Sequence, residues 1–545
     1  MANRCFFFSF SRGLFSCFII LMRYPYLAIY IAFGTFQSNL SKIVVENDKN
    51  RHRVSEKHLK KIFASLKKLF ESNLLCTWAS TLIMFNFDQS RIIMISSTKS
   101  RRDSFNGLFG EFGKSTKITF TLLFLIFVAT LHVFAFIVMP MSYGKNEEIH
   151  GHFNENYSRV VQAFKKNFMD GFERDGANFA VFHKNKAVVN LWAGTADSRV
   201  GKQWTMQTLN ILFSVTKPLS GLCVAVLVDR GYLKFDDPVS KYWPEFAQNG
   251  KSKVTVRQIL GHEAGLPYIE EMIDFEDAEG NATEVLRKLA AAKPIWDPTS
   301  GATGYHPVTF GWLVDGIVRH VDPKKRTLKQ FFHEEIANPY NLDITIGGDL
   351  DHLNRIAYVT HPSPMEIIRD LIIDPRLFFM YLLTKFQPSE AIIHRVAENP
   401  KFIDISQEVF PFNDPRVLQL SIGSATGLAT AHDLAKLFAL MLDGQLISSS
   451  TLEEISKPSI ESWHIEKTVI YPLMKGHGFF YDYHPQKTGK YVFGHPGYGC
   501  QGLHIDPDNE LIIAYLSNGL KTSTSILCLP YQRLIAETYQ ALKQA

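Results

Sequence analysis

The sequence predicts an α/β (α+β) fold, in which an antiparallel sheet is flanked by helices and interrupted by a mostly helical insert. Residues 179–182 and 187–192 have the pattern of two strands joined by a polar turn, and residues 502–505 and 511–516 form a second such pair. Between the two pairs, residues 256–420 are richer in helical patterns. Strands from both ends of the folded region are therefore expected to share one sheet.

Composition and charge describe a large folded protein. The 545 residues are 46% hydrophobic and 20% charged, which is ample apolar material for a core and argues against a disordered chain. The formal net charge of +5 is small for this length, and the Lys and Arg residues crowd before residue 120. No basic stripe covers the folded part, so nucleic acid is not expected as a partner.

The six cysteines are scattered, without the closely spaced pairs of a metal site. Their spacing indicates neither a zinc site nor a disulfide framework, and neither a metal nor an organic cofactor is expected. Because three of them lie beyond residue 150, at least one thiol there should be free. Cys223, within an apolar helical pattern, is interpreted as a small core residue. The full set is Cys5, Cys17, Cys76, Cys223, Cys500 and Cys528.

A transmembrane helix is predicted at residues 118–143, which contain no acidic or basic residue and are long enough to cross a bilayer. Lys114 and Lys117 precede this segment, whereas Glu147 and Glu148 follow it. By the positive-inside rule, the amino side faces the cytosol. The chain is therefore predicted to be a single-pass membrane protein with its carboxy-terminal domain in the lumen or outside the cell.

The amino-terminal region, residues 1–117, has an uneven composition and no convincing core. Its apolar stretch 6–36 is broken by Arg12, Arg23 and Pro25 into pieces that are short for a membrane span. A second span, a signal-like segment and a mitochondrial transit peptide all remain open for it. A mitochondrial membrane is thus the alternative location.

Two further helical segments bear on the fold. Residues 531–542 have a helical pattern that follows the second strand pair. Residues 370–383 are strongly apolar, but Asp370 and Asp374 make them too polar for a second typical span. We expect a helix buried in the insert, with an apolar lid or membrane-dipping element beside the site as the alternative.

The strongest chemical signal is Ser214 followed three positions later by Lys217, at the start of an apolar helical run. Residues three apart share a helix face, so the hydroxyl and the amine come within reach of each other. The amino end of a helix also offers free N–H groups to an oxyanion. Residues 65–68 and 96–99 repeat the spacing, but they lie in or beside basic stretches typical of solvated surface.

Several segments in the right order resemble the serine β-lactamase-related family, which includes class C β-lactamases, penicillin-binding proteins and family VIII esterases. The resemblance covers about residues 155–540. It implies a catalytic domain at 150–545, with an α/β part assembled from both ends around an antiparallel sheet and a helical insert at about 261–420. The segments that carry it are 213–217, 258–267, 304–307, 425–434 and 494–497.

The resemblance also assigns roles to residues. Ser214 corresponds to the acylated nucleophile, Lys217 to its activating partner, and Tyr305 to a tyrosine whose phenolate can act as general base. Pro307 departs from the family's Tyr-x-Asn element, because proline offers no side-chain donor or acceptor. Recognition of a substrate amide is therefore in doubt.

For the third family element, a literal Lys-Thr-Gly at Lys487 competes with His495. Lys487 lies in a composition typical of a hairpin turn, whereas His495 leads into small residues such as Gly497, as a strand beside a substrate cleft requires. We therefore favour His495, an esterase-like variation that would titrate near neutrality. The backbone N–H groups of Ser214 and Tyr498 would form the oxyanion hole.

These residues predict a membrane-anchored serine hydrolase that forms an acyl-enzyme with an ester or amide, and that is more esterase-like than antibiotic-hydrolysing. The expected partners are a small-molecule or peptide acyl substrate and, through the span, membrane lipid. The alternative is a catalytically weak scaffold that keeps the fold and self-associates as a homo-oligomer. His262 is interpreted as a turn residue with a packing role and is left out of the site.

Overall fold

The computed structural model describes residues 130, 144–460, 466–469 and 473–543. The predicted region 1–117 and, apart from Thr130, the predicted span 118–143 lie outside these residues. None of the helices in the described ranges is long and apolar enough to cross a membrane.

A nine-stranded antiparallel sheet forms the centre of the described part, with the strand order β1-β3-β2-β12-β11-β10-β9-β8 and β4 paired to β3. Its strands are β1 (His150–Phe153), β2 (Gly176–His183), β3 (Lys186–Asp197), β4 (Lys202–Gln203), β8 (Met474–Gly476), β9 (Phe479–Tyr483), β10 (Tyr491–Gly497), β11 (Gln501–Asp506) and β12 (Leu511–Ser517). Both predicted strand pairs are present, as β2–β3 and β11–β12.

The pairing of β2 with β12 joins the two ends of the folded region, which confirms that they share one sheet. Side chains alternate along β2 as a pleated strand requires. Phe179 and Val181 point into one apolar core, and Ala180 and Phe182 into the other. The sheet is therefore buried on both faces, and each face must be covered by helices.

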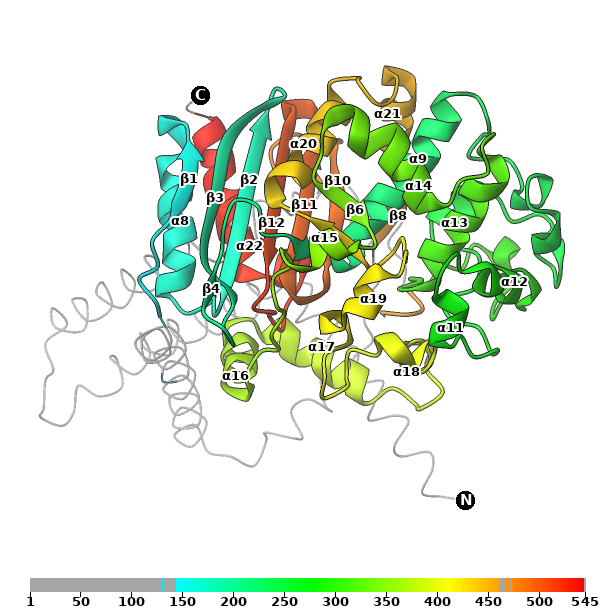
Figure 1. Cartoon of the computed structure of the whole chain (residues 1–545), viewed down its shortest axis with the longest axis horizontal. Helices are drawn as coiled ribbons and strands as arrows, with labels where there is room; N and C mark the ends of the chain where they lie inside the picture. The colour runs from blue at the N-terminus through cyan, green and yellow to red at the C-terminus, as the bar shows by residue number, and fades with distance from the viewer. Residues whose placement is uncertain (1–129, 131–143, 461–465, 470–472, 544–545) are drawn as a thin grey trace, which may run out of the picture. The chain divides into compact units, whose positions relative to one another are not determined.

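One face is covered by α8 (Ser158–Met169) and α22 (Leu529–Leu542), which pack on each other. Helix α22 contains the predicted helix 531–542. On the other face, α20 (Ala431–Leu442) packs on β2 and β12, and α9 (Thr216–Asp229) contacts β9 and β10 (Figure 1). Nearly every side chain of α9 is buried, including those of Thr216 and Lys217. A helix that is apolar on all sides belongs in a core. The turn that carries Ser214, residues 213–215, comes directly before this helix and is called the nucleophile turn below.

The insert is mostly helical, as predicted, and Figure 1 shows α12 and α13 on the far side of α9 from the large sheet. A small sheet of order β5-β7-β6 ties it to the core: β5 (Asn210–Ile211), β6 (Ile344–Ile346) and β7 (Gly427–Ala429). The helices are α10 (Val256–Leu260), α11 (Phe275–Ala278), α12 (Thr283–Ala291), α13 (Thr309–Val321), α14 (Leu328–Phe332), α15 (Leu350–Leu353), α16 (Pro364–Ile373), α17 (Pro375–Lys385), α18 (Ile392–Glu398) and α19 (Pro415–Gln419), with α21 (Ser449–Ile455) after α20.

The apolar run 370–383 is divided between α16 and α17, because Pro375 starts a new helix whose N-cap is Asp374. In α17 Leu377 is buried, but Phe378 and Tyr381 are 44% and 56% exposed. The prediction of a helix buried in the insert is therefore wrong for α17, in which only Leu377 is buried and two large apolar side chains are exposed.

Two cysteines form a disulfide that the sequence spacing did not indicate. Cys500 and Cys528 are 28 positions apart, but the fold places their Cα atoms 5.9 Å from each other and a bond joins them. Such proximity arises from tertiary packing of the turn after β10 against the start of α22, which no local pattern encodes. Cys223 is buried with a free thiol, as predicted.

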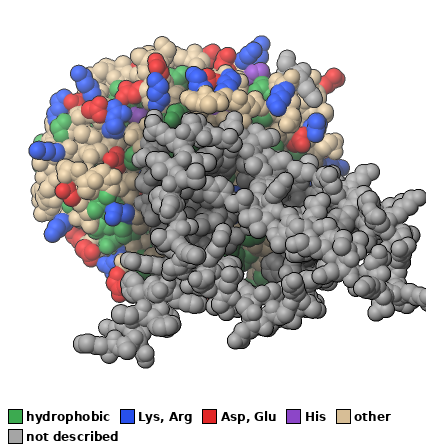
Figure 2. Space-filling model, turned by 180° about the vertical axis from the view of Figure 1, so that it is seen from behind, with side chains coloured by type: hydrophobic (Ala, Val, Ile, Leu, Met, Phe, Trp, Pro, Cys, Tyr) green, Lys and Arg blue, Asp and Glu red, His purple; other side chains and the backbone are tan. Residues whose placement is uncertain are grey.

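The described surface mixes charges of both signs. Figure 2 shows Lys and Arg side chains interspersed with Asp and Glu over the visible described part of one face. This distribution agrees with the small net charge of the chain.

Candidate active site

Ser214 lies in a short 3-10 helix, η3 (Phe213–Val215), immediately before α9, and not inside the α-helix as expected. Phe213 has φ = 47°, a left-handed conformation that is costly for a bulky residue. Thr216 stabilises this turn: its hydroxyl donates to the Phe213 carbonyl at 2.6 Å and accepts from Gly427 N at 2.9 Å. The strained turn is thus held in place by its neighbours.

Lys217 is fully buried, with its Nζ atom 3.3 Å from Ser214 Oγ. Two carbonyls also lie within hydrogen-bond distance of Nζ, Pro307 O at 2.7 Å and Ser424 O at 3.2 Å. Burial lowers the pKa of Lys217 well below its usual value. A neutral amine has two hydrogens and one lone pair. The carbonyls can only accept, so they take both hydrogens and leave the lone pair for the serine hydroxyl.

Tyr305 is the third residue of this group, because its hydroxyl donates to Ser214 Oγ at 2.7 Å. Its ring lies 5.0 Å from that of His262 and 4.7 Å from Lys217 Nζ, so His262 packs directly behind the site. Burial raises the pKa of Tyr305, although the hydrogen bond to Ser214 acts in the opposite direction. The phenol therefore stays protonated near pH 7, which disfavours the expected phenolate base and leaves neutral Lys217 as the stronger candidate.

His495 lies on β10, with its ring 4.1 Å from Phe480 and 6.0 Å from Tyr305. Burial lowers its pKa well below 6.5, so the expected titration near neutrality is not supported. The neutral ring donates from Nδ1 to Pro496 O at 2.7 Å. Its Nε2 atom is buried and has no hydrogen-bond partner in the described part of the chain. A substrate or water donor would satisfy this nitrogen.

Lys487, the competing candidate, lies outside the site. Its Nζ atom donates to the Asp508 carbonyl at 2.7 Å in an exposed position, in the turn between β9 and β10. The geometry therefore favours His495 for the third family element.

Gly497 and Tyr498 lie where β10 meets the nucleophile turn. A Cβ atom on Gly497 would be 2.7 Å from the Leu212 carbonyl, so only glycine lets the strand come this close. Tyr498 begins the 3-10 helix η11 (Tyr498–Cys500), and its ring is 5.8 Å from Phe213. Ser214 and Tyr498 both lie in the first turn of a 3-10 helix, where N–H groups lack an intrahelical acceptor.

Glu466, which was not expected from the sequence, positions Tyr305. Glu466 Oε1 accepts from the backbone N–H of Tyr305, and Oε2 accepts from Thr468 N at 2.9 Å. Lys475 Nζ lies 3.2 Å from Oε1, and both side chains are fully buried. Because Glu466 lies in an irregular segment, neither periodicity nor spacing could have identified this pair.

An aromatic cluster beside the nucleophile was also missed. The Phe213 ring is 6.0 Å from that of Phe410 and 5.1 Å from that of Phe412. Phe410 in turn stacks on Tyr498 at 6.4 Å, and Tyr498 is 39% exposed. The nucleophile therefore lies beside a largely buried aromatic cluster of which Tyr498 reaches the surface, an apolar environment that suits an apolar acyl group.

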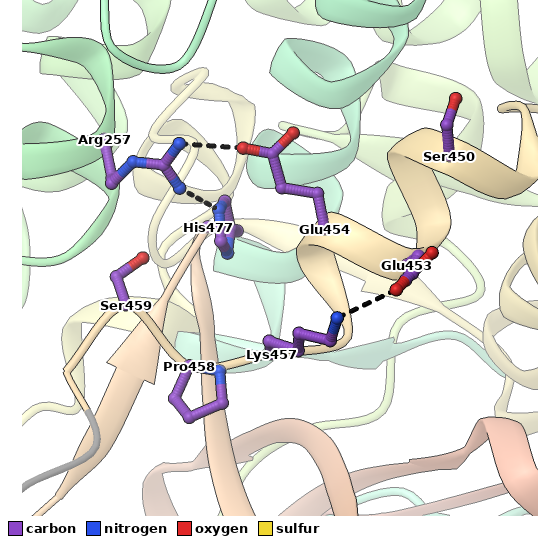
Figure 3. Close-up of a pocket in the computed structure, with 8 residues that line it drawn as sticks. All are labelled: Arg257, Ser450, Glu453, Glu454, Lys457, Pro458, Ser459 and His477. Atoms are coloured by element: carbon purple, nitrogen blue, oxygen red, sulfur yellow. Dashed lines mark hydrogen bonds and ion pairs between the residues drawn. The ribbon is translucent and has the colours of Figure 1, made fainter.

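A separate pocket of about 370 Å³ lies away from these residues, between α10, α21 and β8 (Figure 3). Its charged groups are already paired: Arg257 contacts Glu454 at 2.7 Å and His477 at 2.9 Å, and Lys457 contacts Glu453 at 2.8 Å. The charged side chains of this pocket are thus engaged with one another, and none of the predicted site residues lines it.

Comparisons with known proteins agree with this fold. Residues 161–537 match the family model described as Beta-lactamase. The chain is 28% identical over 379 residues to the Esterase/beta-lactamase LipL of Mycobacterium tuberculosis, covering 68% of this chain and 83% of LipL.

Two solved structures cover 72% of this chain and 100% of their own. They are a penicillin-binding protein homologue from Caulobacter crescentus, with 30% identity and a TM-score of 0.59, and a family VIII carboxylesterase, with 25% identity and a TM-score of 0.61. Since the family model spans well over half of its length, the chain belongs to the beta-lactamase family.

Proposed function

We propose that this hydrolase is a membrane-anchored serine esterase that forms an acyl-enzyme on Ser214. The observation that carries the proposal is the placement of Ser214 Oγ, which lies within hydrogen-bond distance of both Lys217 Nζ and the Tyr305 hydroxyl. A weak nucleophile becomes effective when an adjacent base can take its proton. Neutral Lys217 supplies that base.

In acylation, Ser214 Oγ attacks the substrate carbonyl carbon while its proton passes to the Lys217 amine. The oxyanion of the tetrahedral intermediate is stabilised by the N–H groups of Ser214 and Tyr498. As the intermediate collapses, the carbonyl carbon separates from the leaving-group oxygen. The Lys217 ammonium returns its proton to that oxygen through the Tyr305 hydroxyl, so the alcohol departs neutral.

Deacylation follows the same route in reverse. A water molecule attacks the acyl carbon and gives a proton to Lys217 through Tyr305, and Ser214 Oγ then regains that proton as the ester bond breaks. The unpartnered Nε2 of His495 provides an acceptor for this water. The net reaction is ester plus water to acid plus alcohol.

Esters are favoured over antibiotics and amides for two reasons. Pro307 contributes only its carbonyl, which is already bound to Lys217, so it has no side-chain group for a substrate amide. His495 is neutral and therefore offers no fixed positive charge to an antibiotic carboxylate. The similarity to a family VIII carboxylesterase is consistent with this preference, whereas the name of LipL covers both activities.

The membrane part of the proposal rests on the sequence of residues 118–143, and the lumenal or extracellular side on the charges that flank them. The disulfide between Cys500 and Cys528 supports that side, because disulfides persist in oxidising compartments.

The test is activity-based labelling of the full chain in membranes with a fluorophosphonate probe, with the modified residue mapped by mass spectrometry. We expect an adduct on Ser214 and hydrolysis of a short-chain nitrophenyl ester, both abolished in Ser214→Ala. Equal turnover by the two proteins would sink the proposal. Full labelling without turnover would favour the weak scaffold.

A further inference from the structure

Helix α16 buries charged side chains and exposes apolar ones, the reverse of a helix on a water-facing surface. Its charged residues Glu366, Arg369 and Asp370 are buried, whereas Met365 and Ile368 are 38% and 45% exposed. In water the opposite arrangement is favourable, since burying charge costs free energy and burying apolar surface gains it. The apolar face of α16 therefore needs a partner that is not water.

The buried charges explain why α16 holds this orientation. Glu366 accepts from Arg174 Nη1 at 2.8 Å, and Arg369 Nη1 donates to the Gly171 carbonyl at 2.6 Å. Arg369 also pairs with Asp370 at 3.0 Å. These contacts fasten the polar side of the helix to the body of the domain, so its apolar side cannot turn inward.

Helix α17 extends the exposed apolar face. It packs on α16 and presents Phe378 and Tyr381, and Phe386 at its end is 80% exposed. Figure 1 shows α16 and α17 next to each other along one edge of the described part. We define the α16–α17 face as Met365, Ile368, Phe378, Tyr381 and Phe386. Exposed apolar side chains concentrated on two helices that pack on each other are typical of an interaction site.

The position of the predicted span identifies the partner. Lys145 follows the last residue of segment 118–143 by two positions. Two residues of extended backbone span about 7 Å at most, so the Cα atom of Lys145 lies within that distance of the end of the segment. Lys145 Nζ donates to the Arg174 carbonyl at 2.7 Å, and Arg174 is the residue that pairs with Glu366 of α16. Lys145 therefore lies beside the start of α16, and a bilayer entered by the predicted span would lie near the α16–α17 face.

We propose that the α16–α17 face docks on the lipid bilayer that the predicted span enters, as an interfacial element that lies in the headgroup region without crossing it. At 10 and 11 residues, α16 and α17 are too short to span a membrane but long enough to lie in its surface.

The segment that leads into α16 contacts the aromatic cluster beside Ser214. His361, three residues before α16, contacts Phe410 at 4.6 Å, and Phe410 belongs to the aromatic cluster beside the nucleophile turn. If the proposed esterase function holds, its substrate is an acyl ester with a long apolar chain, delivered from the membrane.

The test uses the full chain in phosphatidylcholine vesicles, with Cys5, Cys17 and Cys76 changed to Ser. An environment-sensitive fluorophore is attached at Tyr381→Cys or, as the matched control, at Tyr232→Cys, which is 45% exposed in the wild-type chain and follows the end of α9. Vesicles containing doxyl-labelled lipid should quench the label at 381 at least threefold more than the label at 232.

Equal quenching at both positions overturns the docking, as does a chain that fails to float with the vesicles. Protection at 381 that rises with protein concentration and not with lipid identifies a second copy as the occupant, which also overturns it.

A second arm tests the substrate class with methylumbelliferyl palmitate in vesicles and methylumbelliferyl acetate in solution. The ratio of palmitate to acetate turnover should fall about tenfold in Phe378→Glu/Tyr381→Glu and stay constant in Tyr232→Glu. Equal ratios overturn the membrane route to the site. Absence of turnover of both esters by the wild type contradicts the proposed function, while the quenching still decides the docking.

Discussion

The Tyr305 hydroxyl donates a 2.7 Å hydrogen bond to Ser214 Oγ across a sequence separation of 91 residues. The phenol comes from the insert, and the nucleophile from the turn between the small sheet and α9. The site is therefore assembled at the junction of the two parts of the fold, and its geometry depends on how the insert is anchored.

Tyr305→Phe removes the proton relay and keeps the ring packed against His262 and Phe480. We expect kcat for a short-chain ester to fall about 10²- to 10⁴-fold, the usual contribution of positioned acid–base help. Thermal unfolding should be nearly unchanged, because only one hydroxyl is lost. Wild-type kcat in Tyr305→Phe would remove Tyr305 from the mechanism.

The pH dependence should report Lys217. Because burial lowers the Lys217 pKa, the amine loses its proton at a lower pH than an exposed lysine does, and activity is lost as pH falls through that lowered value. The Tyr305 pKa is raised, so its hydroxyl stays protonated well above neutrality. The kcat/KM profile should therefore show one acid limb and a plateau into the alkaline range, and a rise first appearing near pH 10 would contradict neutral Lys217.

The oxyanion hole should be sensitive to Gly497. In Gly497→Ala the new Cβ would lie 2.7 Å from the Leu212 carbonyl, which forces β10 away from the nucleophile turn. A displaced oxyanion donor costs roughly 10²-fold or more in kcat. Gly519→Ala is the matched control, since its Cβ would meet its nearest atom at 3.4 Å, an ordinary contact. Equal activity of the two variants would contradict the assigned position of the hole.

The structure shows how far the sequence could predict this site. Ser214 and Lys217 could be predicted because their spacing acts within one local segment. Tyr305 and His495 could be predicted because they lie in motifs that follow in the expected order. Protonation states could not be predicted, since they depend on burial that only the folded chain provides. The Cys500–Cys528 bond and the exposed face of α17 escaped prediction for a related reason: both follow from tertiary packing that no local pattern records.

Glu466 should position Tyr305 through its backbone. Glu466→Ala removes the acceptor for Tyr305 N–H and leaves Lys475 buried without a partner, a loss of about 3–5 kcal/mol in unfolding free energy. Glu466→Ala/Lys475→Met removes the stranded charge, so most of the stability should return while kcat stays at least about tenfold low, equivalent to 1.4 kcal/mol. Recovery of kcat together with stability would show that the pair is only structural.

The disulfide should stabilise both the fold and the oxyanion turn. It closes a loop across 28 positions, for which chain entropy predicts a contribution of about 3–4 kcal/mol to the unfolding free energy. Cys500 is two residues after Tyr498, so loss of the disulfide should also lower kcat. We expect reductant to lower the melting temperature and kcat of the wild type and to leave Cys500→Ser/Cys528→Ser, already lowered in both, unaffected. If the reductant released two thiols in the wild type without changing its melting temperature, a stabilising role would be contradicted. The double variant is the control for other effects of the reductant.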